Sequence, residues 1–310
     1  MVYEHVPVMA REVGQFLNVG PHRRFLDGTL GGAGHSEQIL IDSSPDGQVL
    51  GLDWDDEALV EARRRLARFQ DRVTLRQSSF SAAREILSEI GWHSVHGAIL
   101  DLGASSHQLR SEERGFSFRS QARLDMRMDR RQSLDAYQIV NSFPAAELEK
   151  ILRTFGEERQ ARRIAWRIAE ARRSKPLETA AELAQLIERV VKGSRAQGHH
   201  PATQSFQALR IAVNQELRHL ELFLADGYEL LEPNGRMVII SFHSLEDRLV
   251  KTAFRKWGRD CLCPPRAPTC RCGWNRKVRL LTRKPIAPSA SEIESNPRAR
   301  SAKLRAVERI

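Results

Sequence analysis

Asp27 ends a short apolar run and is followed by four glycines within seven residues, in a segment (25–40) that reads FLDGTLGGAGHSEQIL. A helical pattern begins after the glycines, at about Glu37. A strand, a glycine-rich turn and a helix in this order are typical of a chain that holds a nucleotide-like ligand, because glycine lets the ligand approach the backbone closely. The ligand could be a dinucleotide, a nucleoside triphosphate or an adenosine compound without phosphate.

The spacing of the glycines disfavours both common phosphate-binding motifs. A P-loop requires a lysine after its last glycine, and the dinucleotide motif requires Gly-x-Gly-x-x-Gly; neither occurs here. Asp53 ends a second apolar run about 20 residues further on, where a carboxylate can accept from ribose hydroxyls. Asp27 directly before the turn disfavours a pyrophosphate and favours a ligand with positive charge. S-adenosylmethionine carries a ribose, a sulfonium and an ammonium group without phosphate, so the pattern favours it over NAD.

Alternating strands and helices are needed to bring these acids together. Apolar segments separated by helical patterns predict four strands, at 24–27, 48–53, 72–77 and 96–103. Strands joined by helical crossovers form a parallel, doubly wound sheet, so the fold class is α/β. The carboxyl ends of such strands meet at one edge, where we expect Asp27, Asp53 and Asp101.

The alternation stops after the fourth strand. From about Arg114 to His200 the sequence has helical patterns and no convincing strand, and the strand signal returns at 235–244. Two last strands, VRLLT and LRAVE, have no room for a crossover helix between them and could form an antiparallel edge. We therefore predict a sheet domain, 1–114 and 213–310, interrupted by a mostly helical domain at 115–212.

The charge balance points to a polyanionic partner. Lysine and arginine number 49 against 39 aspartates and glutamates, a net charge of +10, and phosphate contacts rest on arginine and lysine. The alternative is a soluble surface with surplus positive charge. No apolar run approaches the ~18 residues that span a bilayer, and the N-terminus has no secretory pattern. We expect a cytoplasmic protein without a membrane partner.

Several further motifs occur in a fixed order along the chain. They are DLGASSHQL (101–109), ERGFSF (113–118), LDMRMD (124–129), HPATQSFQALRIAVNQEL (200–217), SFHSLEDRLVK (241–251) and NPRARSAKLR (296–305). Together with DGTLGGAGHS they closely resemble the bacterial 16S rRNA cytosine-N4 methyltransferase family (RsmH/MraW). The resemblance extends from EHVPVM near the start to NPRARS near the end.

The resemblance implies a class I (Rossmann-like) methyltransferase sheet with a helical insert. It also implies methyl transfer from S-adenosyl-L-methionine to the exocyclic N4 of a cytosine in the decoding centre of 16S rRNA, within the small ribosomal subunit; no DNA partner is expected. The cofactor-binding residues that it implies are Ala33, Gly34, His35, Asp53, Phe80, Asp101 and Gln108.

Four of these residues also have a structural interpretation. Asp53 could cap the following helix, although Asp55 can do so as well. Phe80 could belong to the core rather than flank an adenine. Gln108 would be only a loop residue without the family match, and His35 could offer its backbone N–H rather than its ring.

Methyl transfer from a sulfonium is an in-line displacement that depends mainly on positioning. The N4 lone pair of cytosine is shared with the ring, so acceptors aimed at the amino hydrogens would favour the nucleophilic form and help remove a proton. The candidate catalytic residues are Asp101, Ser105, Ser106 and His243. Turn chemistry for the serines and a structural hydrogen bond for His243 are equally open.

The segment 157–175 predicts an amphipathic helix with a basic face. Ile164, Ile168 and Ala171 form one stripe at about 100° per residue. The opposite side combines basic residues with an aromatic one, which suits a phosphate backbone and a stacked base. The residues that we expect to bind RNA are Arg159, Arg162, Arg163, Trp166 and Arg167. A solvated charged face, with Trp166 packed between domains, is the alternative.

All four cysteines occur in CLCPPRAPTCRC, at Cys261, Cys263, Cys270 and Cys272. Clustering in a cytoplasmic chain indicates metal before disulfide, but Cys-x-Cys pairs are tighter than most structural zinc motifs. Zinc binding and a reduced loop both remain open, and methyl transfer requires neither.

Two other functions compete with the methyltransferase interpretation. An NAD-dependent oxidoreductase is disfavoured by the glycine spacing and by Asp27. A non-catalytic assembly factor for the small subunit would bind RNA and adenosylmethionine but transfer no methyl group.

Overall fold

The protein was analysed as a computed structural model, which describes residues 7–105, 108–109, 111, 113–191, 200–264 and 269–310. The chain forms two compact units: Met1–Gly103 with Leu217–Ile310, and Ala104–Glu216. The first unit, here called the sheet unit, carries all seven strands of the described chain, and the second, the helical unit, carries none.

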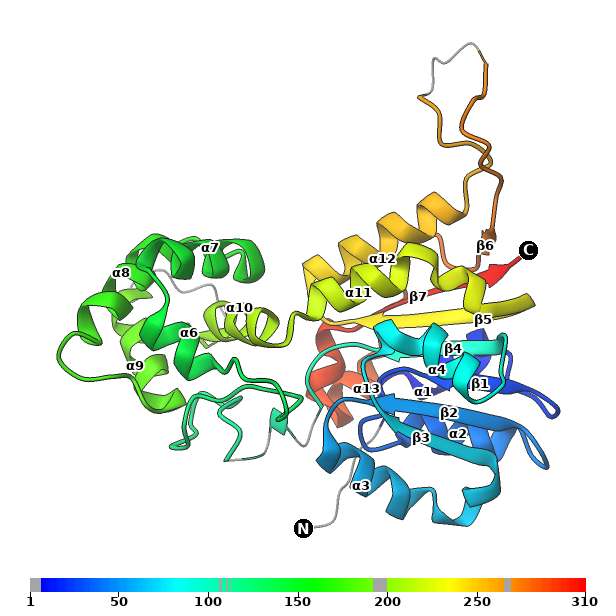
Figure 1. The fold of residues 1–310 in the computed structure, drawn as a ribbon, viewed down its shortest axis with the longest axis horizontal. Helices are drawn as coiled ribbons and strands as arrows, with labels where there is room; N and C mark the ends of the chain where they lie inside the picture. Colours follow the sequence, from blue (N-terminus) through cyan, green and yellow to red (C-terminus); the bar gives the residue numbers. More distant parts are fainter. Residues whose placement is uncertain (1–6, 106–107, 110, 112, 192–199, 265–268) are drawn as a thin grey trace. The chain divides into compact units, whose positions relative to one another are not determined.

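The sheet has the strand order β3-β2-β1-β4-β5-β7-β6 (Figure 1). The first five strands pair in parallel, and β7 runs antiparallel to both of its neighbours. The predicted α/β class and the antiparallel edge are thereby confirmed. The strands are β1 (Arg24–Asp27), β2 (Gln48–Asp53), β3 (Val73–Gln77), β4 (Val95–Asp101), β5 (Leu231–Ser241), β6 (Val278–Leu280) and β7 (Lys303–Arg309).

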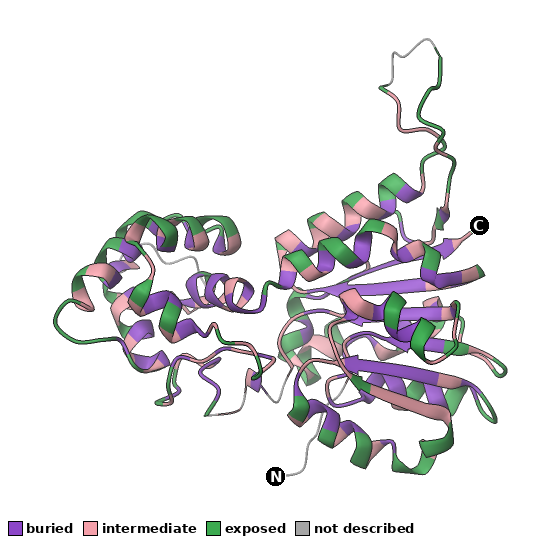
Figure 2. Ribbon diagram, in the orientation of Figure 1, coloured by how far each residue is buried: buried purple, intermediate pink, exposed green. Residues whose placement is uncertain are grey.

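Helices cover both faces of this sheet, which explains why the central strands read as continuous apolar runs. One face packs on α1 (Ala10–Leu17), α2 (Gly34–Asp42) and α3 (Asp56–Arg65). The other face packs on α4 (Ala83–Glu89), α11 (Glu216–Asp226) and α12 (Ser244–Trp257). Figure 2 shows the strands as largely buried and the outer sides of the helices as exposed. A short helix, α13 (Ala290–Ser295), precedes β7.

The helical unit contains α6 (Ala136–Ser142), α7 (Ala145–Gly156), α8 (Ala161–Ala171), α9 (Ala180–Val191) and α10 (Thr203–Asn214). Its apolar core includes Leu148, Ile164 and Leu209, all at most 1% exposed. Helix α8 is shorter than the predicted span 157–175. Glu157 has a positive φ of 49° and caps the end of α7, so the chain turns there before α8 begins.

Across the described residues, no helix combines the length and apolar character needed to cross a membrane.

Candidate cofactor and substrate site

The glycine-rich turn after β1 is fastened to the strands on both sides. The Gly28 N–H donates to the Ile99 carbonyl in β4 at 3.0 Å, and the Leu30 N–H donates to the Leu52 carbonyl in β2 at 2.9 Å. The Asp101 N–H donates to the Thr29 hydroxyl at 2.6 Å. The turn therefore joins the carboxyl ends of β4, β1 and β2 into one rigid edge.

Packing against neighbouring side chains requires a glycine at position 28. A Cβ at this position would lie 2.4 Å from Cδ2 of Leu100 and 2.8 Å from Cβ of Phe80. Gly31 instead has a positive φ of 48°, which side chains rarely adopt. The sequence pattern alone does not separate these two roles.

Asp27 stabilises the glycine turn through buried hydrogen bonds. Its carboxylate is 1% exposed and accepts from the Ser36 hydroxyl at 2.7 Å and from the Thr29 N–H at 3.2 Å. Burial raises the pKa of Asp27, and the two donors oppose this rise only in part. Both carboxylate oxygens thus accept from internal donors, and Asp27 links the glycine turn to Ser36 in α2.

Asp53 lies at the end of β2 with one hydrogen bond to each carboxylate oxygen. The donors are the Gly31 N–H at 2.8 Å and the Asp55 N–H at 2.9 Å. Loss of hydration raises the pKa of Asp53 to about 7 despite these donors. The side chain of Asp55 caps α3 by accepting from the Glu57 N–H at 3.1 Å, so Asp53 is not required as a cap. A carboxylate has further lone pairs, which can accept from ribose hydroxyls.

Aromatic rings gather beside Asp53. Phe80 follows β3 and is 6% exposed; its ring lies 6.4 Å from Trp54 and 5.7 Å from Phe223 between centroids. Trp54 also meets His219 edge-on at 5.1 Å. Phe80 is therefore largely a core residue, and the partly exposed Trp54, which sequence reasoning missed, lies directly after Asp53.

His219 is a second residue that sequence reasoning missed. Its Nδ1 lies 3.0 Å from the Ser79 hydroxyl and 2.8 Å from the Ser81 hydroxyl, and burial lowers the pKa of the imidazole. The only signal for it in the sequence is a histidine in a helix that follows the insert.

The start of α2 faces the end of β4. Ala33, with a positive φ of 59°, caps α2, and Gly34 and His35 form its first turn. Nε2 of His35 lies 3.6 Å from Oδ2 of Asp101, and both side chains are mostly buried. Nε2 of His35 and Oδ1 of Asp101 have no hydrogen-bond partner within the described residues. Buried polar atoms in folded proteins nearly always have a partner, so this pair fits a site that a polar ligand completes.

His243 holds the start of α12. Its ring nitrogen Nδ1 accepts from the Glu246 N–H at 3.4 Å, and the Glu246 carboxylate accepts from the N–H groups of Phe242 and His243. Nε2 of His243 lies 3.1 Å from Oε1 of Glu246, and the side chain is 8% exposed. The bond to Nδ1 and the bond from the His243 N–H form a reciprocal capping box with Glu246, whereas Nε2 of His243 has no hydrogen-bond partner within the described residues.

Ser105 and Gln108 belong to the helical unit, where each binds the other. The Ser105 N–H donates to Oε1 of Gln108 at 2.9 Å, and the Gln108 N–H donates to the Ser105 hydroxyl at 3.2 Å. Gln108 is 3% exposed. Ser106 lies outside the described residues.

Helix α8 turns its apolar stripe inward and its basic face outward. Ile164 and Ile168 are buried, whereas Arg162, Arg163 and Arg167 of α8 are exposed, as is Arg159, which precedes the helix. Trp166 is 55% exposed, and the Arg167 guanidinium lies 5.1 Å from its ring centroid. Arg167 also pairs with Glu170 at 2.7 Å.

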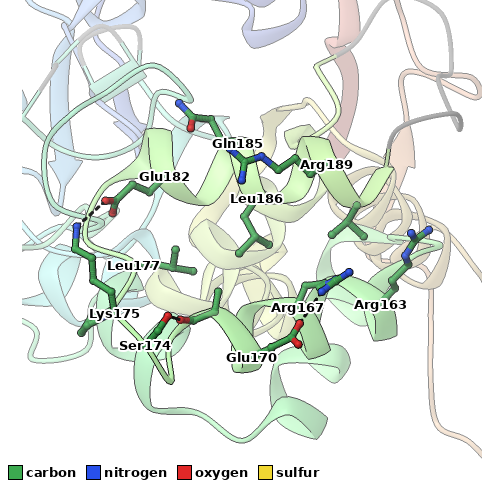
Figure 3. A pocket seen from close by; sticks show the side chains of 13 residues that line it. Arg163, Arg167, Glu170, Ser174, Lys175, Leu177, Glu182, Gln185, Leu186 and Arg189 are labelled. Carbon is green, nitrogen blue, oxygen red and sulfur yellow. Dashed lines mark hydrogen bonds and ion pairs between the residues drawn. The ribbon is translucent and has the colours of Figure 1, made fainter.

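A groove of about 670 Å³ runs between α8 and α9 within the helical unit (Figure 3). Arg163, Arg167 and Arg189 line one part of it, and Lys175, paired with Glu182 at 3.1 Å, lines another. Apolar side chains such as Leu177 and Leu186 lie between these charges. The cations in the lining outnumber its acids.

The fold and its site define a class of enzyme. A sheet in the order 3-2-1-4-5-7-6 with an antiparallel seventh strand, a glycine turn after β1 and an acid that ends β2 are the features of a class I methyltransferase. Residues 2–310 match the MraW methylase family, and the chain belongs to it. The protein is therefore a methyltransferase, and S-adenosylmethionine is its methyl donor.

Curated relatives match along their whole length. The ribosomal RNA small subunit methyltransferase H of Syntrophotalea carbinolica is 50% identical over 100% of this chain and 99% of its own. The proteins of the same name from Heliobacterium modesticaldum and Clostridioides difficile are 48% and 45% identical, each over 100% of both chains.

Proposed function

We propose that this methyltransferase modifies the exocyclic N4 of a cytosine in the decoding centre of 16S rRNA, within the small ribosomal subunit. The names of the relatives support small-subunit ribosomal RNA as the substrate. The motifs from DLGASSHQL to NPRARSAKLR support cytosine N4, because they are those of the cytosine-N4 family. The net charge of +10 and the basic face of α8 agree with a polyanionic substrate.

The cofactor would lie along the edge formed by the glycine turn. Asp53 would accept from the ribose hydroxyls, and Trp54, with Phe80 behind it, would flank the adenine. His35 and Asp101 would face the charged methionine end, since their buried polar atoms lack partners in the described chain. Ala33 and Gly34 complete the proposed cofactor contacts at this edge. Gln108, which belongs to the helical unit, stays a prediction from the family resemblance. When bound, the cofactor supplies a methyl group on a positively charged sulfur, which needs no further activation.

The observation that carries the catalytic proposal is the hydrogen bonding of Asp101. Its backbone N–H is held by Thr29 at 2.6 Å, whereas Oδ1 has no partner within the described residues. A carboxylate on a backbone held in this way can accept from the amino group of cytosine, favour its pyramidal form and take the proton lost on methylation. Nδ1 of His243 caps α12, whereas its Nε2, like Oδ1 of Asp101, has no hydrogen-bond partner within the described residues, so His243 stays a second candidate. We prefer Asp101 as the proton acceptor because it ends β4 directly beside the glycine turn and His35.

The helical unit would hold the RNA. The exposed arginines of α8 suit phosphates, and Trp166 offers a face for an unpaired base. A cytosine in folded RNA must leave its stack to reach the cofactor, and contacts with the flanking backbone would stabilise that state.

The experiment that tests this proposal measures transfer of labelled methyl from S-adenosylmethionine to assembled small subunits, naked 16S rRNA and DNA. Mass spectrometry then identifies the modified nucleoside. N4-methylated cytidine in one rRNA fragment is the expected result. Methylation of another base or of DNA alone would overturn the proposed substrate, and cofactor binding without any transfer would favour a non-catalytic assembly factor.

A further inference from the structure

All four cysteines lie in the segment that joins α12 to β6, between Trp257 and Val278. The described residues of this segment, 258–264 and 269–277, have no helix or strand, and Figure 1 shows these two arms extending beyond α12 and β6. Cys270 and Cys272 are exposed and Cys261 and Cys263 are half-buried, so the described arms do not bury their cysteines in an apolar core. A loop of this length requires some other interaction to stay folded.

The base of the loop is fastened to the sheet unit. The Lys277 N–H donates to the Trp257 carbonyl at 2.8 Å, and Trp257 is fully buried. The Trp274 indole donates to the Arg259 carbonyl at 3.1 Å, and Arg276 pairs with Asp260 at 2.7 Å. The two arms are therefore held together below the cysteines, which brings the two Cys-x-Cys pairs face to face.

The sulfur atoms form a compact cluster. Sγ of Cys261 lies 3.4 Å from that of Cys270 and 3.6 Å from that of Cys272, and Cys270 and Cys272 are 3.6 Å apart. All four Sγ atoms lie within 4.8 Å of one another. A disulfide requires about 2.05 Å between sulfurs. A tetrahedral zinc site with Zn–S bonds of about 2.3 Å places its sulfurs roughly 3.8 Å apart, so the cluster matches a metal site far better.

Backbone N–H groups point at the same sulfurs. Cys261 accepts from the Cys263 N–H at 3.3 Å, Cys272 from the Leu262 N–H at 3.3 Å, and Cys263 from the Arg271 N–H at 3.4 Å. Such donors stabilise thiolates and orient them toward a metal, because they offset the negative charge that four thiolates bring together.

We propose that Cys261, Cys263, Cys270 and Cys272 bind one Zn²⁺ as a closed tetrahedral site that holds the two described arms of this segment, 258–264 and 269–277, against each other. Soft thiolate ligands select zinc over magnesium or calcium, and four protein ligands leave no open position for a substrate or water. The four thiols release protons to solvent as they bind the metal.

The cysteine cluster and the proposed methyl-transfer site lie at opposite edges of the sheet. β6 is antiparallel to β7, as is β5, so β6 runs in the same direction as β5. The loop therefore enters β6 at the amino edge of the sheet, whereas Asp27, Asp53 and Asp101 end their strands at the carboxyl edge. The metal thus has a structural role and takes no part in methyl transfer.

The test uses the full chain, purified under reducing conditions, stripped with a chelator and titrated with Co²⁺. One equivalent is expected to give thiolate-to-cobalt charge transfer and the visible absorption of tetrahedral Co²⁺, and Zn²⁺ is expected to displace it. The double variant Cys270→Ser/Cys272→Ser should bind Zn²⁺ about a hundredfold more weakly or not at all. The control Thr269→Ser keeps all four thiols and should behave as the wild type.

A second measurement reports the role of the metal. Zinc is expected to slow proteolytic cleavage between residues 258 and 277 at least severalfold in the wild type and not in the double variant. The proposal is overturned if Co²⁺ gives no tetrahedral spectrum, if the double variant gives the same spectrum, or if zinc leaves the cleavage rate of the wild-type loop unchanged.

Discussion

The carboxyl edge of the sheet and the outer face of α8 use charge in opposite ways. At the sheet edge three acids lie in a largely buried setting, where burial raises the pKa of Asp27 and of Asp53. On α8 the arginines are exposed and Trp166 lies open to solvent. The first region suits a small cationic ligand, and the second suits a long polyanion.

The difference predicts how each region responds to mutation. In a buried site each polar group has a fixed place, so the loss of one atom leaves a partner unsatisfied and has a large effect. On an exposed face, screening and solvation reduce the contribution of each charge. A single charge mutation there should have a small effect, and several together should have a measurable one.

The largest effect is expected for Asp101→Asn. The amide keeps the shape of the side chain but is a poor proton acceptor, so we expect kcat for methyl transfer to fall by about a hundredfold or more. Single-turnover methylation of small subunits measures this, with Asp42→Asn, an exposed acid of α2, as the control. A variant with wild-type kcat would exclude Asp101 as the proton acceptor.

Reversing Arg162 and Arg163 to Glu should weaken RNA binding by roughly tenfold to a hundredfold at moderate salt, and it should lower the salt dependence of binding. Affinity for S-adenosylmethionine should stay unchanged. Lys150→Glu/Arg153→Glu on α7 makes the same change in net charge and serves as the control. Equal losses in both double variants would indicate a general charge effect instead of a contact by α8.

The pKa of about 7 at Asp53 predicts a pH dependence of cofactor binding. Ribose hydroxyls bind the ionised carboxylate, so affinity for S-adenosylmethionine should be about tenfold lower at pH 6 than at pH 8. Calorimetric titration across this range measures it. Asp53→Asn should bind weakly with a flat profile, and a flat profile in the wild type would contradict the prediction.

The same group affects stability with a definite sign. Because the folded pKa of Asp53 lies above its ordinary value of 3.8, the folded state holds a proton that the unfolded state releases. This contribution to the free energy of unfolding is present below about pH 4 and is lost as pH rises toward 7. Asp53→Asn should remove that part of the pH dependence.

The smallest effect is expected at His243. Replacement by Ala removes a helix cap and should lower the free energy of unfolding by about 1 kcal/mol, measured by urea denaturation. His243→Asn restores a good capping residue and should recover most of the loss. A large fall in methyl transfer in the stable Asn variant would instead support His243 as the proton acceptor.

Much of this fold follows from the pattern of the sequence. The apolar runs at 24–27 and 48–53 are buried on both faces of the sheet, which is why they lack alternation and indicate parallel strands. The acids that end them reach one edge because parallel strands share their direction. Asp55 was also predictable as the cap of α3, since it directly precedes a helical pattern.

Other features depend on contacts between residues far apart in the chain. Position 28 must be glycine because the side chains of Leu100 and Phe80 occupy the space of a Cβ. The ring of Trp54 packs edge-on against His219, which lies far away in the sequence. Helix α7 ends at Gly156 because Glu157 adopts a left-handed conformation, although the surrounding sequence favours helix. Local propensity does not contain this information, because tertiary packing decides it.

The division of the sheet unit into two chain segments has a consequence for biosynthesis. β4 pairs with β5, which follows it by about 130 residues, and a ribosome that adds roughly 5–20 residues per second needs on the order of ten seconds to reach it. During that interval the nascent chain already contains β1 to β4, three of which end in Asp27, Asp53 and Asp101. One edge of β4 has no partner strand until β5 is made. An open edge can pair with another chain, so the exposed edge of β4 makes the nascent chain liable to aggregate during this interval.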